Sequence, residues 1–242
     1  MDHGDAMNGK SLVLCPVYNE REFLEKFYAR LRAHYDGAVL FVDDGSTDGS
    51  GRILRRMCDY RTLLLRHPER IGYGSALRSG FACALKNDYE NIVTLDADLQ
   101  HDPREIAVFL SMLVEHEVVL GSRYMRGAAH ADAPPERFII NRYVAGLMRE
   151  LFSVMCTDPF CGFRGYRDSF LKKVRLGERG YGLGLEILIE LVRTKTPFRE
   201  IPVEAIYVNP QRAFLDGLDD PRRRLLDYLD VISRKRGQAT LL

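Results

Sequence analysis

The sequence has few of the features that mark small extracellular, membrane-spanning or nucleic-acid-binding proteins. Its five cysteines form no CxxC pair, which argues against a disulfide framework or structural zinc and favours a reducing cytosol. No apolar run reaches the roughly 18 residues of a membrane-spanning helix, and the polar start MDHGDAMNGK does not resemble a signal peptide. A net charge of +1 gives no reason to expect nucleic acid as a partner. We therefore expect a cytoplasmic protein whose contact with a membrane, if it has one, is peripheral.

Strand-like and helix-like segments alternate over residues 11–125. Five apolar runs, from SLVLC to EVVLGS, each end in polar residues, and amphipathic helical patterns fill the intervals. Because these runs are continuous rather than alternating, they predict parallel strands buried on both faces. The chain is therefore predicted to form an α/β fold with a mostly parallel, doubly wound sheet and helices on both faces.

The regular alternation of strand-like and helix-like segments ends after residue 125. Two helices are predicted at residues 134–155 and 180–195, a tight loop at 158–167 and a late strand at 198–208. We place the domain boundaries from this change and from the basic C-terminal segment. The predicted units are a disordered tail at 1–10, a catalytic domain at 11–212 with halves 11–125 and 126–212, and a C-terminal amphipathic basic helix and tail at 213–242.

Polar side chains follow four of the predicted strands. In open α/β sheets, ligands bind beyond the carboxyl ends of the strands. The residues at these ends are Pro16, Tyr18, Asn19, Glu20, Asp43, Asp44, Asp96, Asp98, Gln100, Ser122 and Arg123. Any single acid among them has a simpler reading as a helix cap, but the whole set predicts one binding site at a common rim.

The stretch DADLQHDP carries the most specific chemistry. Asp96 and Asp98 follow the run IVTL directly, and Gln100 adds an amide oxygen. Such oxygen ligands suit Mg²⁺ or Mn²⁺ rather than zinc, and Mg²⁺ usually completes its shell with substrate phosphates. The trio therefore predicts a metal site for a diphosphate ligand. His101 is expected to face solvent on the turn, and Pro103 to begin the next helix.

Other nucleotide-binding classes fit the sequence less well. A GxxxxGK[ST] loop is absent, and GYGSALRSG does not follow the first strand as a dinucleotide fingerprint would. A sugar nucleotidyltransferase would carry a glycine-rich loop after the first strand, where this chain has CPVYNE. That class remains an alternative, as does a catalytically silent nucleotide-binding scaffold.

Six segments resemble glycosyltransferase family 2 in the family's order along residues 11–170. They are PVYNE, VDDGSTDGS, GYGSALRSG, DADLQHDP, GSRYMRG and DPFCGFRGYR. The similarity is greatest to the dolichyl- or polyprenyl-phosphate mannosyltransferase-like branch. It implies the GT-A fold of nucleotide-diphospho-sugar transferases. It also implies inverting transfer of one sugar from a nucleotide-diphosphate sugar, with a polyprenyl or dolichyl phosphate as the favoured acceptor.

The resemblance also implies roles for matching residues. Those implied to bind the nucleotide sugar are Pro16, Tyr18, Glu20, Asp43, Asp44, Asp96 and Asp98. Those implied to hold Mg²⁺ or Mn²⁺ on the donor diphosphate are Asp96, Asp98 and Gln100. Those implied to meet the acceptor are Arg123, Arg137, Arg142 and Arg164, and Asp98 and Arg123 would also serve catalysis. Asp158 belongs to the loop expected to close the other side of the site.

The chain departs from the family pattern at two places. Phe160 and Cys161 replace a small hydroxyl pair, which would reshape the sugar or acceptor pocket. The late basic segment of the family is replaced by NPQRAFLDGLDDPRRRL, in which Arg212 is a candidate substitute. These departures leave the acceptor as the least determined feature.

The acceptor decides whether a general base is needed. A hydroxyl acceptor needs one, and Glu186 is the candidate, its alternative reading being a helix carboxylate paired with an arginine. An acceptor phosphate is already anionic and needs arginines instead. A family 2 transferase acting on a glycan, lipid or small-molecule hydroxyl is therefore the main alternative.

The C-terminal helix is predicted at residues 221–236, with an apolar stripe among arginines and lysines. The stripe consists of Leu225, Leu226, Leu229 and Ile232. One interpretation is peripheral docking on anionic lipid at the cytoplasmic membrane face. The others are packing against the domain and packing against a second subunit in a homodimer.

Overall fold

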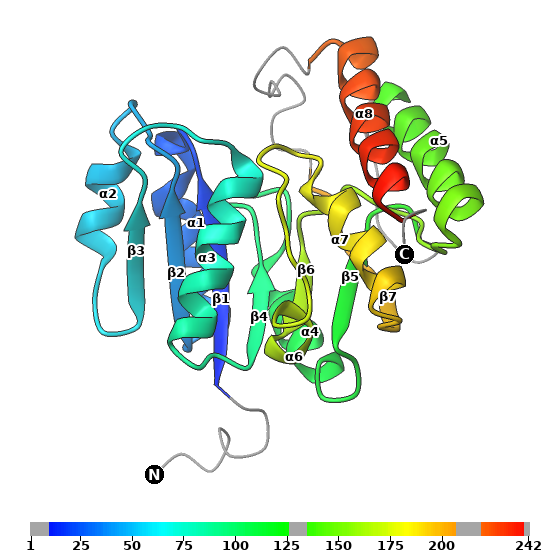
Figure 1. Ribbon diagram of the computed structural model, residues 1–242. Helices are drawn as coiled ribbons and strands as arrows, with labels where there is room; N and C mark the ends of the chain where they lie inside the picture. The colour runs from blue at the N-terminus through cyan, green and yellow to red at the C-terminus, as the bar shows by residue number, and fades with distance from the viewer. Residues whose placement is uncertain (1–9, 126–134, 207–218, 240–242) are drawn as a thin grey trace.

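The computed structural model describes residues 10–125, 135–206 and 219–239 (Figure 1). The predicted tail before Lys10 and the predicted boundaries at residues 126 and 212 lie outside these ranges. Within the described ranges the strands are β1 (Ser11–Val17), β2 (Ala38–Asp43), β3 (Thr62–Arg66), β4 (Asn91–Thr94), β5 (Val118–Ser122), β6 (Arg164–Arg167) and β7 (Phe198–Pro202).

The described strands form a single sheet in the order β3-β2-β1-β4-β6-β5-β7. Parallel pairing joins β1 to β2 and β4, β2 to β3, and β5 to β7. Strand β6 runs antiparallel between β4 and β5, and its Gly165 pairs with Val93 and Val119. The mostly parallel sheet predicted from the sequence is therefore confirmed, with one reversed strand inserted.

The helices cover both faces of the sheet. They are α1 (Arg21–His34), α2 (Ser50–Met57), α3 (Tyr73–Lys86), the short 3₁₀ helix η2 (Pro103–Glu105), α4 (Ile106–Met112), α5 (Pro135–Phe152), α6 (Asp168–Leu171), α7 (Leu183–Arg193) and α8 (Pro221–Ala239). Figure 1 shows α5 and α8 side by side at the end of the molecule that carries β5 and β7.

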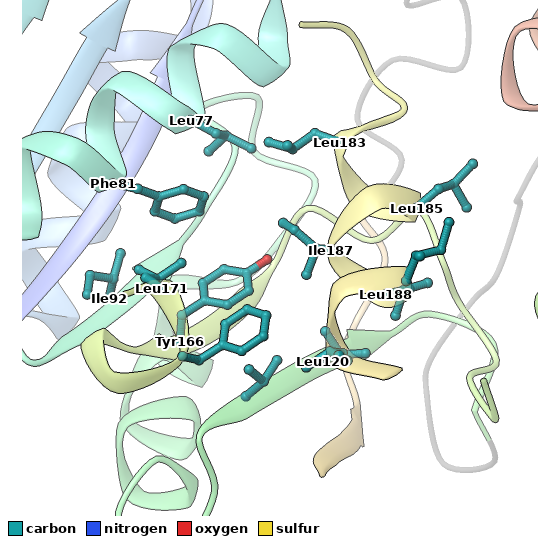
Figure 2. Packing of buried hydrophobic residues seen from close by; sticks show 14 of the residues in the cluster. Leu77, Phe81, Ile92, Leu120, Tyr166, Leu171, Leu183, Leu185, Ile187 and Leu188 are labelled. Atoms are coloured by element: carbon teal, nitrogen blue, oxygen red, sulfur yellow. The ribbon is translucent and has the colours of Figure 1, made fainter. Parts of the chain in front are cut away.

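Successive residues of β1 divide between two hydrophobic cores. Leu12 and Leu14 pack with the apolar sides of α3 and α7, whereas Val13 and Cys15 pack with α1, α2 and α4. Side chains of a strand alternate between the faces of a sheet, so a strand buried on both faces reads as a continuous apolar run. In the first core, Tyr166 of β6 lies between α3 and α7 (Figure 2), with the Phe81 ring 5.3 Å away.

Two sequence expectations need correction. The predicted loop at residues 158–167 contains β6, because Arg164–Arg167 pair with both neighbouring strands. The predicted stripe on the C-terminal helix is correct only in part: Ile232 is buried and Leu225 packs against the core, but Leu226 is 66% exposed. The buried residues Arg224, Tyr228 and Val231 were not part of the predicted stripe. The helix packs on its own domain through these residues. None of the described helices has both the length and the apolar character needed to cross a bilayer.

Candidate active site

The carboxyl ends of β1, β2, β4 and β5 open into a cleft of about 370 Å³. Most of the predicted site residues line it, namely Pro16, Tyr18, Glu20, Asp44, Asp96, Asp98, Gln100, Arg123, Arg137 and Arg164. Since parallel strands end at one edge of a sheet, residues far apart in the sequence meet there. Asp43, Arg142 and Glu186 are the predicted site residues that do not line the cleft.

Asp96 follows β4 and is held by two neighbours. The Tyr73 hydroxyl donates to Asp96 Oδ1 at 3.0 Å, and the Tyr73 ring stacks on Tyr181 with 5.2 Å between centroids. Burial, reinforced by Asp96, raises the pKa of Tyr73 well above its usual value, so the phenol stays protonated and keeps donating. On the other side, a Cβ at Gly162 would overlap the Asp96 carboxylate.

Asp98 and Gln100 complete an oxygen-rich corner of the cleft. Asp98 Oδ1 accepts the Gln100 backbone N–H at 3.0 Å. Leu99 between them has a positive φ of 63°, which turns the chain sharply and buries its own side chain. Two carboxylates and an amide oxygen fit the hard-oxygen preference of Mg²⁺ or Mn²⁺. The glycine at position 162 keeps the approach to Asp96 clear of a side chain.

The acids after β2 organise loops. Asp44 accepts from the backbone N–H groups of Ile71 and Gly72 at 3.0 and 2.8 Å, and its Oδ1 lies 2.7 Å from His67 Nδ1. Asp43 is fully buried, accepts from the Ser46 N–H and pairs with Arg66 at 3.2 Å. Asp44 thus anchors the glycine-rich turn at the cleft, whereas Asp43 holds the loop after β2 through Ser46.

The edge after β1 presents an aromatic ring and a cation. The Arg70 guanidinium lies 4.8 Å from the centre of the Tyr18 ring, and both residues line the cleft. Asn19 adopts a positive φ of 56°, and its Oδ1 accepts the Thr47 N–H at 2.9 Å. The Glu20 N–H donates to Ser50 Oγ at 3.0 Å. These bonds fix the loop that carries Tyr18.

Arg123 follows β5 and is held rigidly where it lines the cleft. Its Nε and Nη2 donate to the two oxygens of Asp158 at 2.7 and 3.0 Å, and Asn141 Nδ2 donates to the same carboxylate at 2.6 Å. Burial would lower the pKa of Arg123, but Asp158 raises it well above its usual value. Asp158 itself is fully buried, and Arg123 lowers its pKa against the effect of burial. The ion pair therefore fixes the position of the Arg123 guanidinium where it lines the cleft.

Arg164 and Arg142 occupy different positions from Arg123. Arg164 donates to the backbone oxygens of Cys161, Pro159 and Gly184 at 2.8, 2.6 and 3.2 Å, so it holds together the wall that it lines. Arg142 is exposed on α5, with its guanidinium 5.6 Å from the Phe138 ring centre.

Glu186 lies within the wall behind the cleft. Its carboxylate is fully buried and accepts the backbone N–H groups of Gly177 and Glu178 at 2.9 and 2.8 Å. Lys235 of α8 donates to it as well, at 2.5 Å. The alternative reading expected a helix carboxylate paired with an arginine; the structure shows such a carboxylate, but its partner is Lys235.

Three further residues differ from expectation or clarify it. His101 is 4% exposed rather than solvent-facing, because its ring packs against Phe163 at 5.4 Å; burial, with Arg123 adding to it, lowers its pKa to about 4. Phe160 and Cys161 both line the cleft; Phe160 stacks on Tyr228 with 4.1 Å between ring centroids, and Cys161 is almost fully buried. The larger side chain at position 160 thus joins the loop to α8.

Sequence reasoning missed the two cleft residues that α8 contributes. Arg224 and Tyr228 line the cleft one helical turn apart. Their spacing of four is a helical signal, but an arginine in a basic segment gives no sign in the sequence that it is buried.

The family description Glycosyl transferase family 2 matches residues 12–175, which contain every strand end described above except that of β7. The chain belongs to glycosyltransferase family 2. It is a glycosyltransferase, as its motifs predicted.

Two curated family members illustrate the branch. The chain is 29% identical over 202 residues to the polyprenol monophosphomannose synthase of Mycolicibacterium smegmatis, a match covering 80% of this chain and 76% of that protein. It is 30% identical over 198 residues to the undecaprenyl-phosphate mannosyltransferase of Micrococcus luteus, covering 79% and 82%. The predicted likeness to the polyprenyl-phosphate mannosyltransferase-like branch is confirmed.

A solved structure of another protein confirms the fold. The glucosyl-3-phosphoglycerate synthase of Mycobacterium tuberculosis, in complex with Mn²⁺, UDP and glucosyl-3-phosphoglycerate, superposes with a TM-score of 0.71. The sequences are 17% identical, and the match covers 91% of this chain and 78% of the other. At this identity the likeness concerns the fold alone, which is GT-A.

Proposed function

We propose that this glycosyltransferase moves one sugar from a nucleotide-diphosphate sugar to a polyprenyl or dolichyl phosphate, with inversion at the anomeric carbon. The observation that carries the proposal is the composition of the cleft lining. Asp96, Asp98 and Gln100 line one cleft together with the arginines Arg123, Arg137 and Arg224.

The cleft lining also has an apolar part. Its members are Ile140, Phe160, Leu183, Ile187 and Tyr228. Guanidinium groups match the geometry of phosphate oxygens, and an apolar wall beside them suits a hydrocarbon chain. An amphiphilic phosphate would satisfy both features.

The chain's own residues would act mainly by positioning. Tyr18 and Arg70 would flank the nucleoside, Asp44 would keep the glycine-rich turn against the donor, and Arg123 would hold the acceptor phosphate in line with the anomeric carbon. Asp96, Asp98 and Gln100 would hold Mg²⁺ or Mn²⁺, which when bound stabilises negative charge on the departing diphosphate. The acceptor oxygen is already anionic, so no side chain needs to remove a proton from it.

A hydroxyl acceptor is the second candidate. Its required base was assigned to Glu186, whose carboxylate is occupied by two backbone N–H groups and Lys235. That occupation favours the phosphate acceptor.

We also propose peripheral contact with the cytoplasmic membrane face through α5. Ile139 and Tyr143 are 64% and 52% exposed on this helix, and the exposed Arg142 lies beside them. The other side of α5 places Arg137 and Ile140 in the cleft, so a lipid acceptor would reach the site past this helix.

The proposal is tested by sugar transfer from labelled GDP- and UDP-sugars with Mn²⁺ to farnesyl phosphate or farnesol. We expect product with the phosphate alone. Product with farnesol alone would overturn the acceptor assignment. A thermal-shift screen of the same donors with metal identifies the donor, because the bound ligand stabilises the folded state.

A further inference from the structure

The His67 ring connects two polar side chains close to the cleft. Its Nδ1 lies 2.7 Å from Asp44 Oδ1, and its Nε2 lies 2.9 Å from Ser79 Oγ on α3. His67 and Asp44 are 8% and 3% exposed. Asp44 lines the cleft, whereas His67 and Ser79 are not among the lining residues. The imidazole therefore acts on the cleft through Asp44.

The sheet fixes the position of this imidazole. His67 follows β3 directly, and its backbone N–H donates to the Asp43 carbonyl at 2.9 Å, which continues the pairing of β3 with β2. His67 and Asp44 thus meet at the ends of two paired strands. A carboxylate oxygen accepts hydrogen bonds, so Nδ1 carries a proton and donates to Asp44. In the neutral ring, Nε2 then accepts the proton of the Ser79 hydroxyl.

Asp44 uses both of its oxygens to hold the glycine-rich turn before α3. Oδ1 accepts the Ile71 N–H at 3.0 Å, and Oδ2 accepts the Gly72 N–H at 2.8 Å. Each backbone N–H is a single donor, so both are used within the protein. The turn therefore does not offer these two groups to a phosphate as a glycine-rich phosphate loop would. What it presents at the cleft depends on how Asp44 is held.

The first turn of α3 is fixed from a second direction by residues 178–180. The Ser75 N–H donates to the Arg179 carbonyl at 3.1 Å. A Cβ at Gly74 would lie 2.7 Å from the carbonyl oxygens of Glu178 and Gly180, so glycine permits this close approach. The start of the helix is thus held by carbonyl groups, and the turn before it by the Asp44 carboxylate.

We infer that His67 is a positioning residue for the donor nucleotide, which it reaches through Asp44. The inference rests on the proposed function for the identity of the ligand, and it adds a residue that does not touch that ligand. Three donors converge on the Asp44 carboxylate, and the His67 contact is the shortest of them. Without it the carboxylate is free to rotate, and the turn that it holds moves with it. The loss falls on donor affinity, with the transfer step itself little changed.

Two amide variants separate the two contacts of the ring. The amide nitrogen of asparagine takes about the place of Nδ1, and that of glutamine about the place of Nε2. His67→Asn therefore keeps a donor for Asp44, whereas His67→Gln keeps only the contact with Ser79. Calorimetry on full-length protein with Mn²⁺ measures the affinity for GDP and UDP. We expect roughly tenfold weaker binding in His67→Gln, the loss of one hydrogen bond to a charged group, and near wild-type binding in His67→Asn.

The control is His34→Gln, because His34 is exposed at the end of α1. It should bind the nucleotides as the wild type does. All variants are compared at equal unfolding temperatures. Equal losses of affinity in His67→Asn and His67→Gln would show that the ring acts by packing alone, and would overturn the inference. Wild-type affinity in His67→Gln would also overturn it.

Hydrogen exchange of the Ile71 and Gly72 N–H groups tests the same inference without any nucleotide. We expect these two amides to exchange faster in His67→Gln than in the wild type and in His67→Asn. Unchanged exchange in His67→Gln would overturn the inference and leave the proposed function intact. If the wild type binds neither GDP nor UDP with Mn²⁺, the proposed donor fails, and the assignment of His67 to a donor nucleotide fails with it.

Discussion

Asp98 is the residue at which the proposed metal site is tested most cleanly. Asp98→Asn removes one negative charge but keeps an oxygen that can accept the Gln100 N–H, so the turn is preserved. We expect turnover to fall on the order of 100-fold or more, since even outer-shell partners of a metal are worth about 10–100-fold. Nucleotide binding should lose its dependence on Mn²⁺, as measured by calorimetry with and without the ion.

The control for this variant is Asp36→Asn, because Asp36 follows α1, its side chain is 91% exposed and it does not line the cleft. It should behave as wild type. Unchanged transfer by Asp98→Asn at an unchanged unfolding temperature would remove Asp98 from the metal site.

The buried carboxyl group of Glu105 should make the stability of the protein depend on pH. Burial raises its pKa to about 7, although the Glu204 backbone N–H opposes the shift. A carboxyl group whose pKa is raised in the folded state favours folding most below its unfolded pKa. That contribution is lost as the pH rises from about 4.5 to 7.

Glu105→Gln should therefore raise the unfolding temperature at pH 8 and change it little at pH 4. Glu115→Gln, at an exposed position after α4, serves as the control and should show no such difference. An equal effect of Glu105→Gln at both pH values would show that its charge is not the cause.

At the scale of helices and strands, the sequence correctly predicted those elements that have a clear local hydrophobic pattern. The run SLVLC predicted a strand buried on both faces, and β1 has this property. Strand β6 was missed because its four residues, RGYR, are polar and too short to show a period. Its partners lie far away in the sequence, and only tertiary pairing makes it a strand.

The buried face of helix α8 was also not predictable from local sequence. The apolar pattern selected Leu226, which is exposed, and overlooked Arg224 and Tyr228, which are buried. The face that a helix buries is set by its neighbours, here α5 and α7. When a helix has apolar residues on two sides, the sequence alone does not show which side is buried. The strand-end acids were predictable because parallel topology alone brings them together.

Glu186 is predicted to connect elements rather than to act as a base. It joins α7 to α8 through Lys235 and receives the backbone of the 177–178 turn. Glu186→Gln keeps an acceptor for those N–H groups, so we expect sugar transfer at a pH-independent fraction of wild type, with a lowered unfolding temperature. A general base contributes about 10²–10⁴-fold, so a loss of that size with unchanged stability would restore Glu186 as the base.

At the scale of the whole molecule, the proposed membrane contact requires one particular side of the protein to face the lipid. The helix α5 presents Ile139 and Tyr143 outward and lines the cleft with Arg137. Apolar side chains beside arginines favour insertion into an anionic interface, and the electrostatic part of such binding weakens with salt. This orientation would place the cleft mouth at the level of the lipid headgroups.

We expect full-length protein to co-sediment with phosphatidylglycerol vesicles at low salt and less so at high salt. The double variant Ile139→Asp/Tyr143→Asp should lose most of this binding while retaining donor binding. Val114→Asp is the matched control, because Val114 is 55% exposed and follows α4, which covers the opposite face of the sheet. If Val114→Asp lowers vesicle binding as much as the α5 variant does, the protein does not bind the membrane through one particular side. If the α5 variant binds vesicles as the wild type does, α5 is not the contact, and a lipid acceptor must enter the cleft from another side.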